Sequence, residues 1–181
     1  MPANGLNRIT ADLTGNRENR PIKRTTMDVH PEAALQVWRR NRKNLLQFMN
    51  SYDAAQLNRV PDGFSNNLIW NLGHILAVQQ LLVYGLSGQP LQIPQKFVVR
   101  YQRDTRPEGP VDEAEISEIR EWLERTVPLL DKDLEANRFG TFRPFTNSAG
   151  FRVTNLQEAI TFNNFHEGLH LGYMLSIRKF L

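Results

Sequence analysis

The sequence predicts an all-α protein, a four-helix bundle, and three observations lead to this fold class. Apolar residues recur at three- and four-residue steps in four separate segments, as is typical of helices with one buried face. Two long connections, 88–110 and 139–153, join the later segments. The chain has 181 residues, enough for one domain with a substantial core. Because the 88–110 connection is long enough to cross the length of a bundle, we expect an up-down-down-up course.

The bundle domain is assigned to residues 28–181, behind a flexible N-terminal arm at 1–27. The arm is polar and has neither helical nor alternating periodicity. The first helix begins at Pro31, whose fixed φ suits a first turn. Its apolar positions are Leu35, Trp38, Leu45, Phe48, Met49 and Tyr52. A basic cluster within it, formed by Arg39, Arg40, Arg42 and Lys43, is interpreted as a solvated helix face.

The other three helices are delimited by capping residues and loop signals. The second helix, about 66–87, follows a predicted Ser65 cap and is largely apolar, so it should be buried on more than one side. The third helix opens with Asp112 and Glu115 as a capping box. The fourth helix opens with Thr154 and Gln157 as another capping box and runs to the end of the chain. The 139–153 connection before it is expected to hold a short extended piece.

Composition excludes several classes of function. The chain has no cysteine, so it has no thiolate ligand and no Cys nucleophile, and any nucleophilic sulfur must arrive on a substrate. The net charge is only +3 and is spread along the chain, which argues against nucleic-acid binding. A run of about 18 apolar residues, which a membrane span needs, is absent from the sequence, as is an N-terminal stretch like a signal peptide. A cytoplasmic location is therefore expected.

The stretch "HEGLH" carries the H-E-x-x-H pattern of zinc proteases. His166 and His170 are four residues apart, so they share one helix face and suit one metal ion. A protease of this pattern takes its third ligand downstream, but the position six residues on is Ser176 and no later helix follows. A third ligand is instead expected upstream, where His74 lies on an inward-facing stripe of the second helix with Trp70. The alternative is that these histidines are core residues.

Three residues near this stretch are candidates for a catalytic role, and no catalytic residue is assigned. Glu167 points about 100° away from His166 on the helix, so a charge on the helix surface or between helices is favoured over a general base or a partner of a ligand. Asn163 and Tyr173 lie on the same face as the two histidines. Each is expected either to orient a substrate or a ligand, or to complete a hydrogen bond in the core.

Two segments resemble helices of the DinB-like (DinB/YfiT) superfamily. "NLIWNLGHILAVQQLLVYGLSG" is similar to its second helix, and "TNLQEAITFNNFHEGLHLGYMLSIRKFL" to its closing helix. The resemblance covers roughly residues 30–181. It implies an up-down-down-up bundle, often dimeric, that holds a divalent metal on His74, His166 and His170. It also implies thiol chemistry, because characterised relatives include transferases and isomerases that use bacillithiol, mycothiol or glutathione.

Three neutral imidazoles leave a divalent ion its full charge and at least one open position. Bound water would be acidified, and a bound thiol would lose its proton. We therefore expect a metal-dependent, thiol-dependent S-transferase that carries zinc or nickel and takes a small-molecule substrate. The resemblance to the DinB-like superfamily implies that it forms a homodimer. A metal-dependent hydrolase is one alternative. Another is a non-catalytic bundle, either a metal-stabilised dimer or a small-molecule binder.

Overall fold

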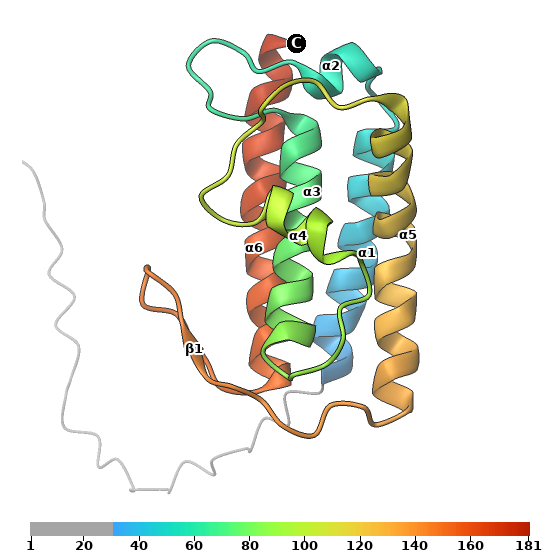
Figure 1. Cartoon of the computed structure of the whole chain (residues 1–181), viewed down its shortest axis with the longest axis vertical. Coiled ribbons are helices and arrows are strands. Elements are labelled where there is room, and N and C mark those ends of the chain that lie inside the picture. Colours follow the sequence, from blue (N-terminus) through green and yellow to red (C-terminus); the bar gives the residue numbers. More distant parts are fainter. Residues whose placement is uncertain (1–30) are drawn as a thin grey trace, which may run out of the picture.

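A computed structural model describes residues 31–181, except for the side chain of Pro31, and the predicted arm at 1–27 lies outside the described residues. Four long helices form a bundle (Figure 1), which confirms the predicted fold class. They are α1 (Pro31–Met49), α3 (Leu68–Gln79), α5 (Glu113–Glu135) and α6 (Leu156–Ile177). A π-helical segment, η1 (Gln80–Gly85), extends α3.

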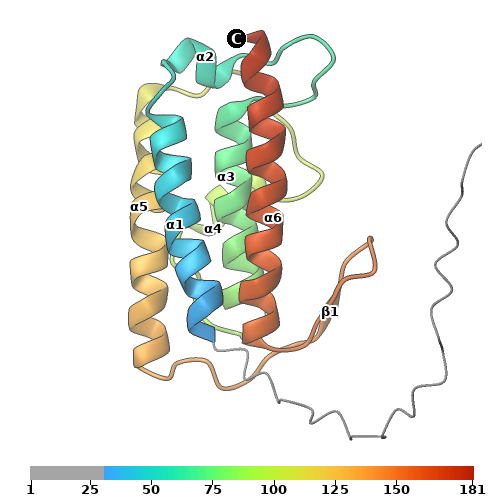
Figure 2. The same cartoon turned by 180° about the vertical axis from the view of Figure 1, so that it is seen from behind.

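The chain directions follow from the colours of the ribbon and from the contacts between helices. In Figure 1, α1 and α6 run upward and α3 and α5 run downward, and the view from behind agrees (Figure 2). Arg39, in the middle of α1, pairs with Asp131 in the last turns of α5, and Asn50, just past the end of α1, accepts a hydrogen bond from Arg120 in the first half of α5. These two contacts hold α1 and α5 antiparallel.

Shorter elements cap and flank the bundle. They are α2 (Ala54–Asn58), α4 (Gln95–Tyr101), η2 (Arg178–Phe180) and the paired strands β1 (Phe145–Thr146) and β2 (Arg152–Val153). The strands confirm the extended piece expected in the 139–153 connection, and they project from the bundle in Figure 1. The 88–110 connection, predicted as a plain linker, contains α4. Its seven residues bury Phe97, Val98 and Tyr101 beside α3.

The starts of two helices differ from the prediction. The N-cap of α3 is Asn67 rather than Ser65, and its side chain accepts the backbone N–H of Trp70 at 2.9 Å. The N-cap of α6 is Asn155 rather than Thr154. In each case an asparagine nearer the first helical turn reaches the free N–H groups, because its short side chain can accept them from that position.

The N-cap of α5 is Asp112, as predicted, and it accepts the backbone N–H of Glu115 at 2.9 Å. The Glu115 carboxylate makes other contacts. It accepts the hydroxyl of Tyr101 and pairs with Arg100. Glu115 therefore ties α4 to the start of α5.

One residue of the predicted basic face lies in the core. Arg42 is only 3% exposed, so the interpretation of this cluster as solvated was wrong for that residue. The reason is positional, because residue 42 continues the helical stripe that also contains Trp38 and Leu45. Arg42 pairs there with Glu167 of α6, with Nη2 and Oε1 2.7 Å apart and both side chains almost fully buried.

A set of donors surrounds the Glu167 carboxylate. Oε1 accepts the Trp38 indole N–H at 2.7 Å and the Asn163 amide at 2.8 Å, while Oε2 accepts the Asn41 amide at 2.8 Å. The guanidinium of Arg42 also reaches Gln79 of α3 and Thr126 of α5. This buried network contacts all four long helices.

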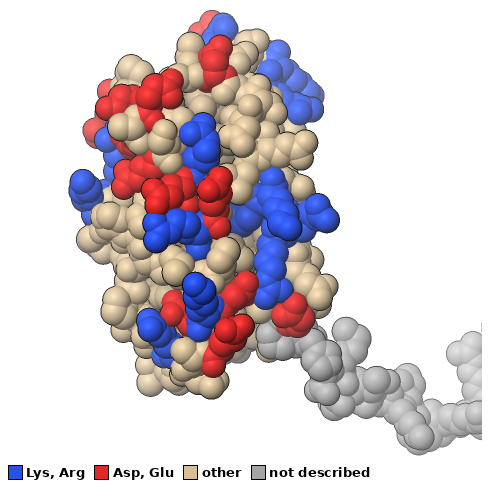
Figure 3. Space-filling model, turned by 90° about the vertical axis from the view of Figure 1, so that its right-hand side faces the viewer, with Lys and Arg blue, Asp and Glu red and all other residues tan. Residues whose placement is uncertain are grey.

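Charge on the outside of the bundle is mixed. On the side shown in Figure 3, where α5 faces the viewer, acidic and basic side chains both occur. Among the described helices, none is both long and apolar enough to cross a bilayer.

We predict that removing one member of the buried pair is far more damaging than removing both. Arg42→Met leaves a buried carboxylate without its cation and should lower the free energy of unfolding by about 3–5 kcal/mol. Arg42→Met combined with Glu167→Leu should recover most of that loss. Urea unfolding measures both effects. The control is Arg125→Met, because Arg125 forms an exposed pair with Glu121 and should contribute less than about 1 kcal/mol. Equal losses for the single and double variants would contradict the prediction.

Candidate metal centre

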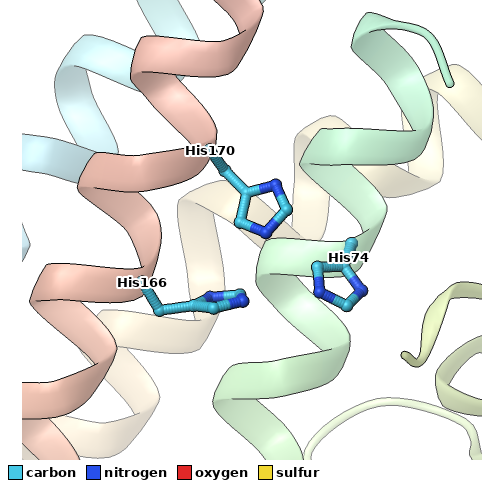
Figure 4. A group of neighbouring side chains, drawn as sticks. All are labelled: His74, His166 and His170. Atoms are coloured by element: carbon cyan, nitrogen blue, oxygen red, sulfur yellow. The ribbon is translucent and has the colours of Figure 1, made fainter. Parts of the chain in front are cut away.

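Helices α3 and α6 bring three histidines together in the middle of the bundle. His74 comes from α3, and His166 and His170 come from successive turns of α6, with all three rings converging (Figure 4). One ligand atom from each lies within 4.8 Å of the others. The ring centroids of His166 and His170 are 4.5 Å apart, and that of His74 lies 5.2 and 4.8 Å from them.

The backbone of α4 fixes the ring of His74. The Nδ1 of His74 lies 2.6 Å from the carbonyl oxygen of Tyr101. A carbonyl only accepts, so Nδ1 carries the proton and Nε2 keeps its lone pair. This close approach depends on Gly73, because a Cβ there would lie 2.5 Å from Cδ1 of Tyr101. Trp70 stacks on the ring of His74. The two ring centroids are 4.8 Å apart and the ring planes are nearly parallel.

A side-chain amide fixes the ring of His170. Its Nδ1 lies 2.7 Å from Oδ1 of Asn71, a fully buried residue of α3. The amide nitrogen of Asn71 donates to the carbonyl of Asn67 and to the side chain of Asn66, which settles the orientation of the amide. Oδ1 must therefore accept, so His170 also presents Nε2 with a free lone pair.

His166 lacks such support. Its Nδ1 is buried and has no hydrogen-bond partner among residues 31–181. An imidazole left in this state loses the hydrogen bonds it makes in water, which is costly in an apolar surrounding. A ligand bound by this ring would offset part of that cost.

All three histidines are held neutral. Burial is the main cause, and it lowers the pKa of His74 although the Tyr101 carbonyl opposes the shift. Burial and repulsion from the other two rings lower the pKa of His166 to about 3. Burial and repulsion from His74 lower the pKa of His170 to about 4. At neutral pH the site therefore offers unprotonated nitrogens, which is the form that binds a metal.

The donor set fits a divalent transition metal. A tetrahedral ion bound at about 2.1 Å holds its nitrogen ligands about 3.4 Å apart, so the widest pair would close by up to about 1.4 Å. In the described part of the chain, no carboxylate belongs to the group, which consists of the three imidazoles alone. Zinc and nickel accept such ligands, whereas magnesium and calcium prefer oxygen.

The three catalytic candidates make their described contacts with residues other than the three histidines. Glu167 and Asn163 are fully buried in the Arg42 network, where Asn163 donates to Glu167 at 2.8 Å. Tyr173 packs edge-on against Phe64, with the ring centroids 5.6 Å apart. The described contacts thus join Glu167 to α1, Asn163 to Glu167 and Tyr173 to the loop before α3.

Two residues that support the histidines were not predicted. Asn71 had a signal, since it is a polar residue inside an apolar helix and one turn from His74. Tyr101 acts through its backbone carbonyl, and any residue type supplies a carbonyl, so the sequence carries no signal for it.

A family model described as the DinB superfamily matches residues 38–174. The match includes all three histidines, Arg42 and Glu167. No curated protein matches the chain significantly.

We predict that the metal-free protein loses stability as the pH falls below the ordinary histidine value of 6.5. The histidine pKa values are lowered in the folded protein, so the unfolded chain binds more protons in this range. The free energy of unfolding should fall by up to about 1.4 kcal/mol per pH unit for each histidine. Above about pH 7.5 these histidines are unprotonated in both states, so they should no longer make the free energy of unfolding depend on pH.

Urea unfolding with a chelator at about pH 8 and about pH 5 measures this slope. His166→Ala with His170→Ala is the control, because it removes two of the three groups and should flatten the curve. A slope as steep as that of the unaltered protein would contradict the assignment of the effect to these residues.

We also predict that Asn71→Leu weakens zinc binding by about 10- to 100-fold, because the ring of His170 loses the acceptor that fixes its tautomer and orientation. Competition with a chromophoric chelator measures the affinity. The matched control is Asn164→Leu. Asn164 donates to the carbonyl of Ala34 on the α1 side of α6, so its loss should leave the zinc affinity unchanged. Equal weakening in both variants would mean that the effect comes from general loosening of the bundle.

Proposed function

Because the chain belongs to the DinB superfamily, we propose that His74, His166 and His170 hold a zinc or nickel ion in an enzyme that transfers an external thiol to a small-molecule electrophile. The observation that carries the proposal is the triad itself. Three neutral imidazoles meet from two helices, and two of them have their tautomers fixed so that Nε2 faces a shared centre.

The chemistry of the donor set favours activation of an anionic nucleophile. A divalent ion held by neutral ligands supplies a full double positive charge, which lowers the pKa of a bound thiol or water. The chain's own residues keep that charge undiminished. Burial holds the imidazoles unprotonated, and the one carboxylate of the "HEGLH" stretch is turned away to Arg42.

The absence of cysteine places the nucleophilic sulfur on a second substrate. In the proposed reaction the thiol sulfur forms a bond to an electrophilic carbon. The leaving group departs with the electron pair of the broken bond, and the thiol proton passes to solvent. A cytoplasmic location would suit this reaction, because thiols are kept reduced there. That location and the homodimer remain predictions.

A hydrolase is the second candidate, and one observation weighs against it. In the hydrolytic use of H-E-x-x-H, the Glu acts as general base on a metal-bound water. Here both oxygens of Glu167 accept hydrogen bonds from α1, from Trp38 and Arg42 on one side and Asn41 on the other. A non-catalytic, structural site would be closed by a fourth protein ligand, and the group of histidines contains none in the described residues.

The first test is metal content. Protein purified without chelator should contain about one zinc or nickel ion per chain, as a three-histidine site requires. The variant His166→Ala with His170→Ala should contain none. Metal retained in the variant would overturn the site, whatever the reaction.

The second test separates the candidate reactions. Metal-loaded protein is offered a nitroaryl chloride with glutathione, bacillithiol or mycothiol, and then a nitrophenyl ester without thiol. The proposal expects thioether formation that depends on both thiol and metal. Ester hydrolysis without thiol would favour the hydrolase, and metal binding without either reaction would favour the non-catalytic alternative.

A further inference from the structure

A cavity lies beside α3 and α4, with Trp70 in its lining. It has a volume of about 430 Å³ and is lined by α3, α4 and the segment 102–111. This volume is in the range of sites that hold small organic molecules. No histidine lines it, so it is separate from the candidate metal centre.

The floor of the cavity is apolar and aromatic. It is formed by Ile69, Trp70 and Tyr101, all buried, with Val111 beside them. The indole N–H of Trp70 donates to the hydroxyl of Thr105 at 3.2 Å, which holds the ring in place from the loop side. Such a lining favours a flat, apolar ligand, because aromatic rings pack against one another offset or edge to face.

The rim of the cavity is basic. Lys96, Arg100 and Arg106 border it, against one acidic residue, Glu108. Arg100 pairs with Glu115, with Nε and Oε1 3.1 Å apart. For Lys96 and Arg106, no ion pair with a carboxylate is found within residues 31–181. Two cations without a counter-charge therefore stand at the mouth of an apolar cavity, where an anionic ligand would be attracted.

We propose that this cavity binds an aromatic carboxylate. The ring packs against Val99, Val111 and the small exposed part of Trp70, and the carboxylate meets Lys96 and Arg106. The arrangement matches the usual composition of ligand sites, in which an apolar surface supplies contact area and a few charged groups fix orientation. The proposal rests on this cavity alone and holds whether or not the triad carries a metal.

The cavity is also lined by the two residues that hold the ring of His74. Trp70 lines the cavity and stacks on the ring of His74. Tyr101 also lines it, and its backbone carbonyl accepts a hydrogen bond from Nδ1–H of His74. A bound ring therefore lies next to two groups that position one histidine of the candidate metal centre.

The test uses naphthoate as the probe and the full chain as the protein. Isothermal titration should give a Kd below about 1 mM, as expected for an anion of this size in a preformed cavity. Naphthamide, which has the same ring without the charge, should bind at least about tenfold more weakly. The indole N–H resonance of Trp70, identified by its loss in Trp70→Phe, should shift with naphthoate.

Two pairs of substitutions locate the site. Lys96→Glu with Arg106→Glu should weaken naphthoate binding by at least about tenfold. Arg40→Glu with Lys43→Glu makes the same change of charge on exposed residues of α1 and should have little effect. If the first pair does not fold, Arg106→Gln alone should still weaken binding several-fold.

The variant His166→Ala with His170→Ala excludes binding at the triad, and it should keep its affinity for naphthoate. Loss of binding there, equal affinity for naphthoate and naphthamide, or no binding of either would each overturn the proposal.

Discussion

The buried pair of Arg42 and Glu167 is the constraint on which the arrangement of this bundle depends. Glu167 directly follows His166 in α6, and its carboxylate is held on the α1 side by Arg42, Trp38 and Asn41. A helix turns about 100° per residue, so fixing Glu167 toward α1 fixes His166 and His170 toward α3. The pair costs desolvation energy, and its contribution is the rotation and register of α6 rather than net stability.

The same interaction argues against a protease-like use of the H-E-x-x-H sequence. The spacing places two imidazoles on one face in either case, since it is a property of the helix. The Glu side chain points about 100° around the helix from the first His, and its role depends on the side chains that it meets there. In this chain Glu167 meets the buried guanidinium of Arg42 from α1, so its carboxylate forms an ion pair in the core. The histidines are left with neutral surroundings.

Much of this could be predicted because it follows from local periodicity. The bundle came from apolar spacing, and the proximity of His166 and His170 came from their four-residue interval. The burial of Arg42 was missed, because the neighbouring Arg39, Arg40 and Lys43 suggested a solvated face although position 42 belongs to the apolar stripe. The role of Tyr101 was beyond prediction, since it depends on a seven-residue helix between prolines and on a backbone carbonyl.

The three histidines differ in how they are held, and the difference follows from which element supports each. His74 is fixed by α4, an element outside the four long helices, through a contact that only glycine at position 73 permits. His170 is fixed within the bundle by Asn71 of α3. His166 has no such partner among the described residues, and its pKa is lowered to about 3. Two rings are thus preorganised and one is left to adjust. A triad whose ligand atoms are spread over up to 4.8 Å needs such an adjustment to close around one ion.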